Sequence, residues 1–312
     1  MSRNKKEEID YEEYENLKNS RFKQQRLPGM RLLPSMFNAV SYFLSVGILF
    51  AGIGVAIFIF SEDVVSYHEN YTNKTRVTFN ITKKMAGDIM VYYKIDYYYQ
   101  NNRRYLSSIS YDQLSGKNIS LDEIKKDCSP IIKNKDLNIS LNSSGKNLDE
   151  NDIAIPCGLM ARSFILFNDT YNFSINGEPI YINDTNISRK YDRDHYHNVN
   201  LSKQWTNIED EHFLVWMRPS PLSNFTKLYG RIEGYNFSAG SHIDVEISHG
   251  PYYKEDEFIL SNISKTIYIT TVNNFGGNNK RLALSYFIFG IICIILGIIF
   301  FFAFQVHNRK DK

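Results

Sequence analysis

The chain has 312 residues, a formal net charge of +2 and an aromatic content of 14%. A net charge so close to zero gives no electrostatic basis for binding nucleic acid. The aromatic content is too high for a disordered chain and favours a folded domain rich in β-structure.

The first predicted element is a long uncharged segment, residues 36–60, which follows a polar tail. It exceeds the roughly 20 residues that a helix needs to cross the hydrocarbon core. We therefore predict a transmembrane helix over residues 35–60, after an N-terminal tail of residues 1–34. A cleaved signal peptide is a poor alternative, because its apolar region is only about 7 to 15 residues long and lies nearer the N-terminus.

A second uncharged segment predicts a transmembrane helix over residues 282–306, followed by a short tail, 307–312. Positive charge marks the cytosolic side of a span. Basic residues flank the two spans on their outer sides: Lys18, Arg21, Lys23, Arg26 and Arg31, then Arg309, Lys310 and Lys312. Both tails are therefore predicted to be cytosolic, and residues 61–281 form an ectodomain on the lumenal or extracellular side. Lys280 and Arg281 oppose this orientation, but a long translocated domain largely escapes the charge rule.

Sequons for N-linked glycosylation, N-x-S/T, support the same topology. Fourteen of them begin in the ectodomain, and none begins in a tail or a span. Because the chain is rich in asparagine, some sequons are expected to arise by chance, and closely spaced ones are not all expected to be occupied. The candidate residues are Asn70, Asn73, Asn80, Asn118, Asn138, Asn142, Asn168, Asn172, Asn183, Asn186, Asn200, Asn224, Asn236 and Asn262.

The chain has three cysteines, two of them in the ectodomain. Cys128 and Cys157 would lie in an oxidising compartment, where one disulfide is the natural pairing. The alternative is two unpaired thiols. Cys293 lies inside the second apolar segment and is interpreted as a small packing residue.

Several ectodomain segments have the residue pattern of strands. Residues 90–99 are aromatic and β-branched, residues 243–247 alternate strictly between apolar and polar, and residues 266–270 do so in part. Residues 121–126 predict a short helix with Ser120 as its N-cap. We predict a mainly antiparallel, β-sandwich-like domain interrupted by long glycosylated loops.

No catalytic motif of a known kind occurs in the sequence. The densest polar cluster contains His195 and His197, which would share one face of a strand and could bind a metal beside the neighbouring aspartates. A solvated loop is the better interpretation, since no further ligand is evident. Asp210 predicts the start of a strand or helix, and Gly276 with Gly277 predicts a turn. We therefore predict no catalytic residue, no metal and no cofactor.

The two predicted spans contain no Asp, Glu, Lys or Arg. Charges inside the membrane mark ion and proton pathways, so these helices are poorly suited to conduct or transport alone. Small residues line one stripe of each span and allow helix backbones to approach closely. The stripes serve either to dock onto other membrane helices or to pack the two spans on each other. Their residues are Ser41, Ser45, Gly52 and Ala56 in the first span, and Gly290, Cys293 and Gly297 in the second.

Five motifs follow one another in a characteristic order. They are F-K-Q-Q-R-L-P at 22–28, Y-Y-Q-N-N-R-R-Y at 98–105, P-C-G-L-M-A at 156–161 with F-N-D-T at 167–170, D-E-H-F-L-V-W-M-R at 210–218, and F-G-G-N at 275–278. With these motifs and this topology, the chain resembles the accessory (β) subunit family of type IV P-type ATPases, the phospholipid flippases. It departs from that family in having no cysteine between residues 61 and 127, so the family's earlier disulfide has no counterpart.

The resemblance implies a non-catalytic subunit that forms a heterodimer with the ATPase catalytic subunit and contacts membrane lipids. It implies roles in complex assembly, in exit from the endoplasmic reticulum and in the transport cycle. The complex would reside in the endoplasmic reticulum, the Golgi and endosomes, or the plasma membrane. The residues that it assigns to partner binding are Phe22, Arg26, Leu27, Pro28, Arg103, Arg104, Tyr105, Trp216, Arg218, Gly276 and Gly277.

Two other functions have some support in the sequence. A two-span ligand-gated channel subunit shares the topology, although such ectodomains usually hold many disulfides and only one is possible here. An anchored lumenal enzyme would have to use His195, His197 and the aspartates beside them.

Overall fold

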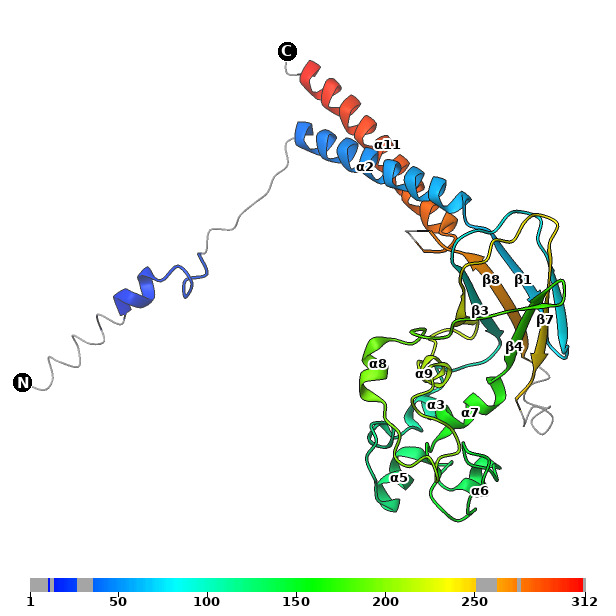
Figure 1. The fold of residues 1–312 in the computed structure, drawn as a ribbon. Coiled ribbons are helices and arrows are strands. Elements are labelled where there is room, and N and C mark those ends of the chain that lie inside the picture. The colour runs from blue at the N-terminus through cyan, green and yellow to red at the C-terminus, as the bar shows by residue number, and fades with distance from the viewer. Residues whose placement is uncertain (1–10, 12–13, 27–35, 251–262, 274–275, 311–312) are drawn as a thin grey trace, which may run out of the picture. The chain divides into compact units, whose positions relative to one another are not determined.

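The computed structural model describes residues 11, 14–26, 36–250, 263–273 and 276–310. It contains two compact units, each considered by itself. The first joins residues 1–55 to residues 284–312, and the second is the continuous stretch 56–283 (Figure 1).

Two long apolar helices confirm the two predicted transmembrane segments. Helix α2 spans Met36–Glu62 and α11 spans Lys280–Lys310. Within them, Phe37–Glu62 and Lys280–Val306 are long and apolar enough to cross a membrane. Helix α2 ends two residues beyond its predicted span, and α11 extends past both ends of its own, because helical hydrogen bonding continues past the point where charged residues begin.

Glycine faces pack the two helices against each other. A Cβ atom on Gly290 would lie 2.6 Å from the backbone nitrogen of Ala51, and one on Gly297 would lie 2.9 Å from the side chain of Leu44. Cys293 lies between these glycines and is buried. The stripe of α11 therefore packs on α2, as one of the two alternatives predicted.

The stripe predicted on α2 does not take part in this contact. Ser41, Ser45, Gly52 and Ala56 are all exposed, and a Cβ atom on Gly52 would meet nothing within 4 Å. Gly47 lies against α11 instead, since its Cβ atom would lie 2.9 Å from the carbonyl of Gly290.

The second unit contains two four-stranded antiparallel sheets, ordered β1-β8-β3-β6 and β2-β7-β4-β5. Every second residue of β3 is buried, and side chains from both sheets, among them Val91 and Phe173, belong to one hydrophobic core. This arrangement confirms the mainly antiparallel domain. The strands are β1 (Ser66–Asn70), β2 (Arg76–Asn80), β3 (Ile89–Asp96), β4 (Thr170–Ile175), β5 (Glu178–Ile180), β6 (Phe225–Ile232), β7 (His242–Ser248) and β8 (Ser264–Thr271).

The strand predicted over residues 90–99 is shorter than expected. It ends at Asp96, because Tyr97 takes a positive φ of 67° and its backbone N–H donates to the side chain of Asn224. A tyrosine in this backbone region turns the chain out of the sheet. The predicted strands at 243–247 and 266–270 lie within β7 and β8.

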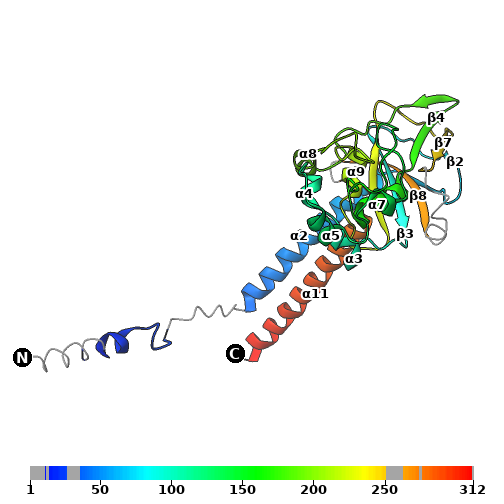
Figure 2. The same ribbon diagram turned by 90° about the horizontal axis from the view of Figure 1, so that it is seen from below.

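Most of each segment predicted as a long loop is irregular, and short helices interrupt these segments. These helices gather into one lobe beside the sheets, which Figure 1 and the view from below in Figure 2 both show. The predicted cap of α5 is confirmed, since Ser120 and Glu123 form a capping box. The helices are α3 (Arg103–Ser107), α4 (Tyr111–Leu114), α5 (Leu121–Cys128), α6 (Asn134–Leu137), α7 (Leu159–Phe167), α8 (Lys190–His195) and α9 (Glu211–Trp216).

Two local predictions in this lobe have clear outcomes. His195 is the last residue of α8, which excludes the alternative in which it shares a strand face with His197; both side chains are exposed, as the preferred interpretation of a solvated segment expects. Asp210 is the N-cap of α9, and its side chain accepts a hydrogen bond from the backbone N–H of Phe213. The predicted start of a strand or helix is therefore the start of a helix.

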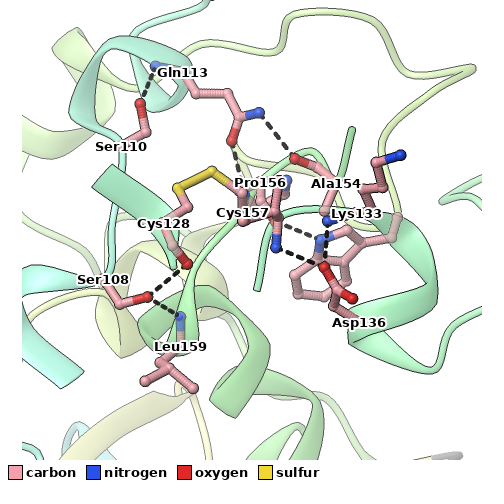
Figure 3. The surroundings of a disulfide bond; sticks show 12 residues. Ser108, Ser110, Gln113, Cys128, Lys133, Asp136, Ala154, Pro156, Cys157 and Leu159 are labelled. Atoms are coloured by element: carbon pink, nitrogen blue, oxygen red, sulfur yellow. Dashed lines mark hydrogen bonds between the residues drawn. A yellow bond between two sulfur atoms is a disulfide. The ribbon is translucent and has the colours of Figure 1, made fainter. Parts of the chain in front are cut away.

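The predicted disulfide between Cys128 and Cys157 is present and joins the end of α5 to the segment before α7. Two buried side chains brace this link (Figure 3). The Ser108 hydroxyl donates to the carbonyl of Cys128, and the Gln113 side-chain oxygen accepts from the backbone N–H of Cys157. A disulfide lowers the conformational entropy of the unfolded chain, and closing a loop of this length stabilises the fold by about 3 kcal/mol.

The sequon asparagines differ in exposure. Asn142 is buried, and its side-chain amide donates to the carbonyl of Ser202. Asn183 is half-buried, and Asn262 lies outside the described residues. The exposed ones are Asn70, Asn73, Asn80, Asn118, Asn138, Asn168, Asn172, Asn186, Asn200, Asn224 and Asn236.

Candidate partner-binding site

Two of the residues that the resemblance assigns to partner binding, Tyr105 and Trp216, are buried. Both contact the hydroxyl of Ser163: the Trp216 indole N–H donates to it over 2.9 Å, and the Tyr105 hydroxyl lies 2.8 Å away. Ser163 donates its own hydrogen to the carbonyl of Met160. This one hydroxyl therefore connects α3, α7 and α9, and both aromatic side chains build the helical lobe rather than face its surface.

The end of α9 is held by a buried lysine, Lys227 of β6. Its ammonium donates to the carbonyl oxygens of Val215, Trp216 and Arg218. It also lies 5.3 Å from the centre of the Trp216 ring. Burial lowers the pKa of Lys227 to about 7, while the carbonyls at the helix C-terminus favour the charged ammonium.

Arg218 lies two residues after the end of α9 and forms a two-point ion pair with Asp192 of α8. Its Nη2 donates to one carboxylate oxygen over 2.8 Å, and its Nε donates to the other. The Asp192 side chain is only 7% exposed, whereas that of Arg218 is 41% exposed. A planar guanidinium bound to both oxygens of a carboxylate has a fixed orientation.

An open pocket of about 450 Å³ lies around this ion pair. Its walls come from α4, from α8 and from the chain after α9. Tyr111 and Tyr191 are both 63% exposed there, and the His195 ring stacks on Tyr191 with 4.0 Å between ring centres. Burial raises the pKa of Tyr196 to about 12, so this phenol is neutral at physiological pH. We call this the Arg218 pocket; it is lined by Tyr111, Asp112, Ser115, Tyr191, Asp192, His195, Tyr196, Met217, Arg218 and Pro219.

The other predicted partner-binding residues do not gather at this pocket. Arg103 and Arg104 are exposed on α3, and Phe22 and Arg26 are exposed in the tail. Leu27 and Pro28 lie outside the described residues.

The predicted glycine turn lies just before α11. The backbone N–H of Gly276 donates to the carbonyl of Asn273 over 2.9 Å. Gly276 has a φ of +90°, which glycine adopts without strain. Gly277 is half-buried beside it.

A buried charge cluster was missed by the sequence reasoning. The Asp169 carboxylate accepts from Lys265 Nζ at 2.8 Å and from the Tyr71 hydroxyl at 3.1 Å, and it lies 3.1 Å from the His249 ring. Burial by itself raises the pKa of Asp169, but the bonds from His249 and Lys265 hold it below its usual value. The sequence did contain one sign of this cluster, a lysine inside an apolar strand. A buried lysine needs a compensating group, and a buried carboxylate is the natural one.

The described residues contain no group of three or more His, Cys, Asp or Glu placed to hold a metal ion. The Asp169 cluster is enclosed in the sandwich and each of its members has a hydrogen-bonding partner, which is the arrangement of a structural ion pair. The Arg218 pocket, by contrast, has exposed rings and a partly exposed guanidinium.

Comparisons with known proteins show which family the chain belongs to. The LEM3 (ligand-effect modulator 3) family / CDC50 family model matches residues 1–310. The chain is 30% identical to "ALA-interacting subunit 3" of Arabidopsis thaliana, covering 94% of this chain and 87% of that protein. It is 26% identical to "Cell cycle control protein 50A" of Bos taurus, covering 90% and 87%, and 24% identical to "Cell cycle control protein 50B" of Homo sapiens, covering 94% and 95%. With a family model matched along nearly its whole length, the chain belongs to the LEM3/CDC50 family, the accessory subunits that its motifs resemble.

Proposed function

We propose that this protein is a non-catalytic accessory subunit of a phospholipid-translocating P-type ATPase. The family match over residues 1–310 carries the proposal, and a curated relative is itself named as an interacting subunit. The two apolar helices, the disulfide and the antiparallel domain are the parts that such a subunit needs.

The chain would form a heterodimer with the catalytic subunit inside the membrane. The predicted spans within its helices, residues 35–60 and 282–306, contain no charged residue that could serve transport, and α11 uses its glycine face to pack on α2. The exposed stripe of Ser41, Ser45 and Gly52 on α2 remains available to a helix of the larger subunit. Lipids of the bilayer would cover the remaining apolar surface.

The orientation follows from charge and sequons. Both tails would be cytosolic, and the ectodomain would be lumenal or extracellular. The complex would reside in the endoplasmic reticulum, the Golgi and endosomes, or the plasma membrane. The subunit would allow the ATPase to assemble, to leave the endoplasmic reticulum and to complete its transport cycle.

Co-purification tests the proposed partnership. The tagged full chain, extracted from membranes of its native host in a mild detergent, is expected to bring down one P-type ATPase chain in equimolar amount. Membranes with the untagged chain provide the control. Recovery of the chain without any P-type ATPase would contradict the proposal, and homotrimers that conduct current in a bilayer would favour the channel alternative.

Depletion of the chain tests the roles in trafficking and transport. In host cells without it, the ATPase is expected to remain in the endoplasmic reticulum and to form less phosphorylated intermediate. An ATPase that reaches its normal membrane and is phosphorylated at the normal level would show that these roles belong elsewhere.

A further inference from the structure

The N-terminal tail is divided into an acidic part and a basic part. Residues 7–15 contain six carboxylates and no Lys or Arg, whereas residues 16–61 contain no carboxylate at all. Four bases lie within residues 18–26, which we call the basic stretch, and all four are exposed. A block of one charge sign in a short tail is typical of a surface that binds the opposite charge. The four bases are Lys18, Arg21, Lys23 and Arg26.

The basic stretch is held in a compact turn by its own backbone. The backbone N–H of Arg26 donates to the carbonyl of Arg21 over 2.8 Å, and that of Gln25 donates to the carbonyl of Phe22 over 3.1 Å. Gln25 has a φ of +53°. These bonds around a left-handed residue form a Schellman cap. The turn therefore needs no other part of the protein, and it brings the backbones of two arginines together.

Large aromatic rings are exposed along the same part of the tail. Residues 14–19 are helical (Figure 1), and Tyr14 and Lys18 are four residues apart, so they lie on one side of this helix. Tyr14 is 63% exposed, and Phe22 in the following turn is 76% exposed. Exposed rings beside basic residues are typical of segments that lie in the membrane interface, where the rings enter the headgroup region and the cations remain at its phosphates.

The first apolar helix holds the basic stretch close to a membrane surface. Arg26 lies ten residues before Met36, where α2 begins. An extended chain spans at most about 3.6 Å per residue, so Arg26 lies within roughly 36 Å of the start of that helix. A segment tethered in this way meets the lipid headgroups of one leaflet at a high effective concentration.

We propose that the basic stretch binds the anionic phospholipid headgroups of the leaflet on the side of the tail, with its four cations on the headgroups and Phe22 inserted beside them. The same surface repels the acidic residues 7–15, so the start of the tail points away from it. This inference goes beyond the proposed function, because its ligand is a lipid surface and not the ATPase. A phospholipid-translocating ATPase would change the composition of that leaflet, and the contact would make the subunit sensitive to this change.

An acidic protein surface is the competing partner, since the resemblance assigns Phe22 and Arg26 to partner binding. The local structure favours lipid. A membrane offers many equivalent phosphates and requires no fixed geometry, which suits four exposed side chains on a turn that forms by itself. A protein site would instead require carboxylates at fixed positions opposite each cation.

The test places the full chain, without any ATPase, in nanodiscs of phosphatidylcholine with a nitroxide on some of the headgroups. A fluorophore is attached through Asn19→Cys, an exposed position of the tail helix. The chain without this substitution gives the background from the buried Cys293. Replacing 30% of the lipid by phosphatidylserine is expected to raise quenching of the fluorophore by the nitroxide at least about threefold. In 0.5 M salt the increase is expected to disappear, because the charges are screened.

Two variants of the labelled chain identify the side chains responsible. Replacing all four bases of the basic stretch by Gln is expected to abolish the increase in quenching, and Phe22→Ser is expected to reduce it. The matched control replaces three bases at the start of the tail, outside the basic stretch, and is expected to behave like the unmodified chain. These substitutions are Arg3→Gln, Lys5→Gln and Lys6→Gln.

Equal quenching of the unmodified chain in the two lipid mixtures would overturn the inference, and so would an increase that the four-base variant retains. An increase that appears only after the co-purified ATPase is added would make the basic stretch a protein-binding surface and would also overturn it. The nanodiscs contain no ATPase, so failure of this test leaves the proposed function intact. Failure of the chain to recover an ATPase from membranes would remove the proposed function and leave the lipid contact.

Discussion

The ammonium of Lys265 lies 2.8 Å from the carboxylate of Asp169, and their side chains are 3% and 1% exposed. Lys265 belongs to β8 of one sheet, and Asp169 directly precedes β4 of the other. The same ammonium donates to the carbonyl of Leu166 in α7. A single buried ion pair thus connects both sheets with the helical lobe, and replacing either member has consequences for all three.

Lys265→Met is expected to destabilise the ectodomain by about 3–5 kcal/mol, because it leaves the Asp169 carboxylate buried without its cation. The double replacement with Asp169→Asn is expected to cost less than the sum of the single ones, since both residues belong to one network. Denaturant unfolding of the purified full chain, followed by tryptophan fluorescence, measures both effects. An unchanged unfolding midpoint for Lys265→Met would contradict the role given to this pair.

Ser163→Ala is expected to destabilise the helical lobe by about 1–3 kcal/mol for each donor left without an acceptor. The Trp216 indole and the Tyr105 hydroxyl both lose the acceptor at Ser163 in this variant, although Tyr105 still accepts from Gln100. Adding Trp216→Phe removes one of those donors but also removes volume from a fully buried side chain, so the double variant is expected to lose less stability than the sum of the two single variants. Thermal unfolding of the single and double variants measures these losses of stability. Additive losses would show that the Ser163 hydroxyl shared by the two donors is not the cause of the destabilisation.

The stability of the ectodomain is expected to rise between pH 7 and pH 9 because of Lys227. Its pKa falls from an ordinary value of 10.5 to about 7 on burial. In this window the unfolded chain therefore binds a proton that the folded chain does not bind. Stability then increases with pH by up to about 1.4 kcal/mol per unit, and below pH 7 the full cost of burying the ammonium is present.

Lys227→Met removes that titrating group and serves as the control. Its unfolding free energy is expected to change less steeply with pH over the same window, measured by denaturant unfolding at several pH values. Equal slopes for the two proteins would show that Lys227 does not titrate there.

Asn142 is expected to carry no glycan, whereas Asn138 is available for one. The Asn142 amide is buried and bonded to Ser202, so a sugar there is incompatible with the fold, while Asn138 is exposed. Enzymatic deglycosylation in heavy-oxygen water followed by mass spectrometry marks occupied sites. A labelled Asn142 in folded protein from the native host would contradict this expectation.

Gly290→Leu is expected to separate the two apolar helices and lower the thermal stability of the purified chain in detergent. The added side chain would meet the backbone of Ala51 and of Gly47 within 3 Å, which rigid helix backbones cannot avoid. Gly52→Leu is the matched control, since a Cβ atom there meets nothing within 4 Å. Equal stability of the two variants would place the helix contact elsewhere.

Local signals were enough to predict much of the fold. The two apolar helices were predicted from their length and lack of charge, and the cap at Ser120 from residues close in sequence. The pairing of Cys128 with Cys157 followed from a choice among three cysteines. The physical causes of these features do not depend on the tertiary structure. They are the thickness of the hydrocarbon core, helix capping and an oxidising compartment.

The features that escaped prediction depend on distant residues. The turn at Tyr97 is fixed by Asn224, and the lysine inside β8 makes sense only beside Asp169. The stripe on α2 was assigned without knowing that Gly47 would face the other helix. A periodic pattern identifies a face of a helix but not the neighbour that covers it. The Arg218 pocket likewise forms from three segments that a linear sequence does not bring together.

The first and last strands of the ectodomain are hydrogen-bonded to each other, with Ser66 opposite Thr270 and Asn70 opposite Thr266. The chain leaves one apolar helix shortly before β1 and enters the other shortly after β8. A force that pulls those helix ends apart therefore acts directly on the backbone hydrogen bonds between β1 and β8. The rest of the domain does not carry this force. The loops that contain sequons and the helical lobe can vary in length or move without changing the spacing of the two ends, so the mechanical constraint and the surface of the helical lobe belong to separate parts of the chain.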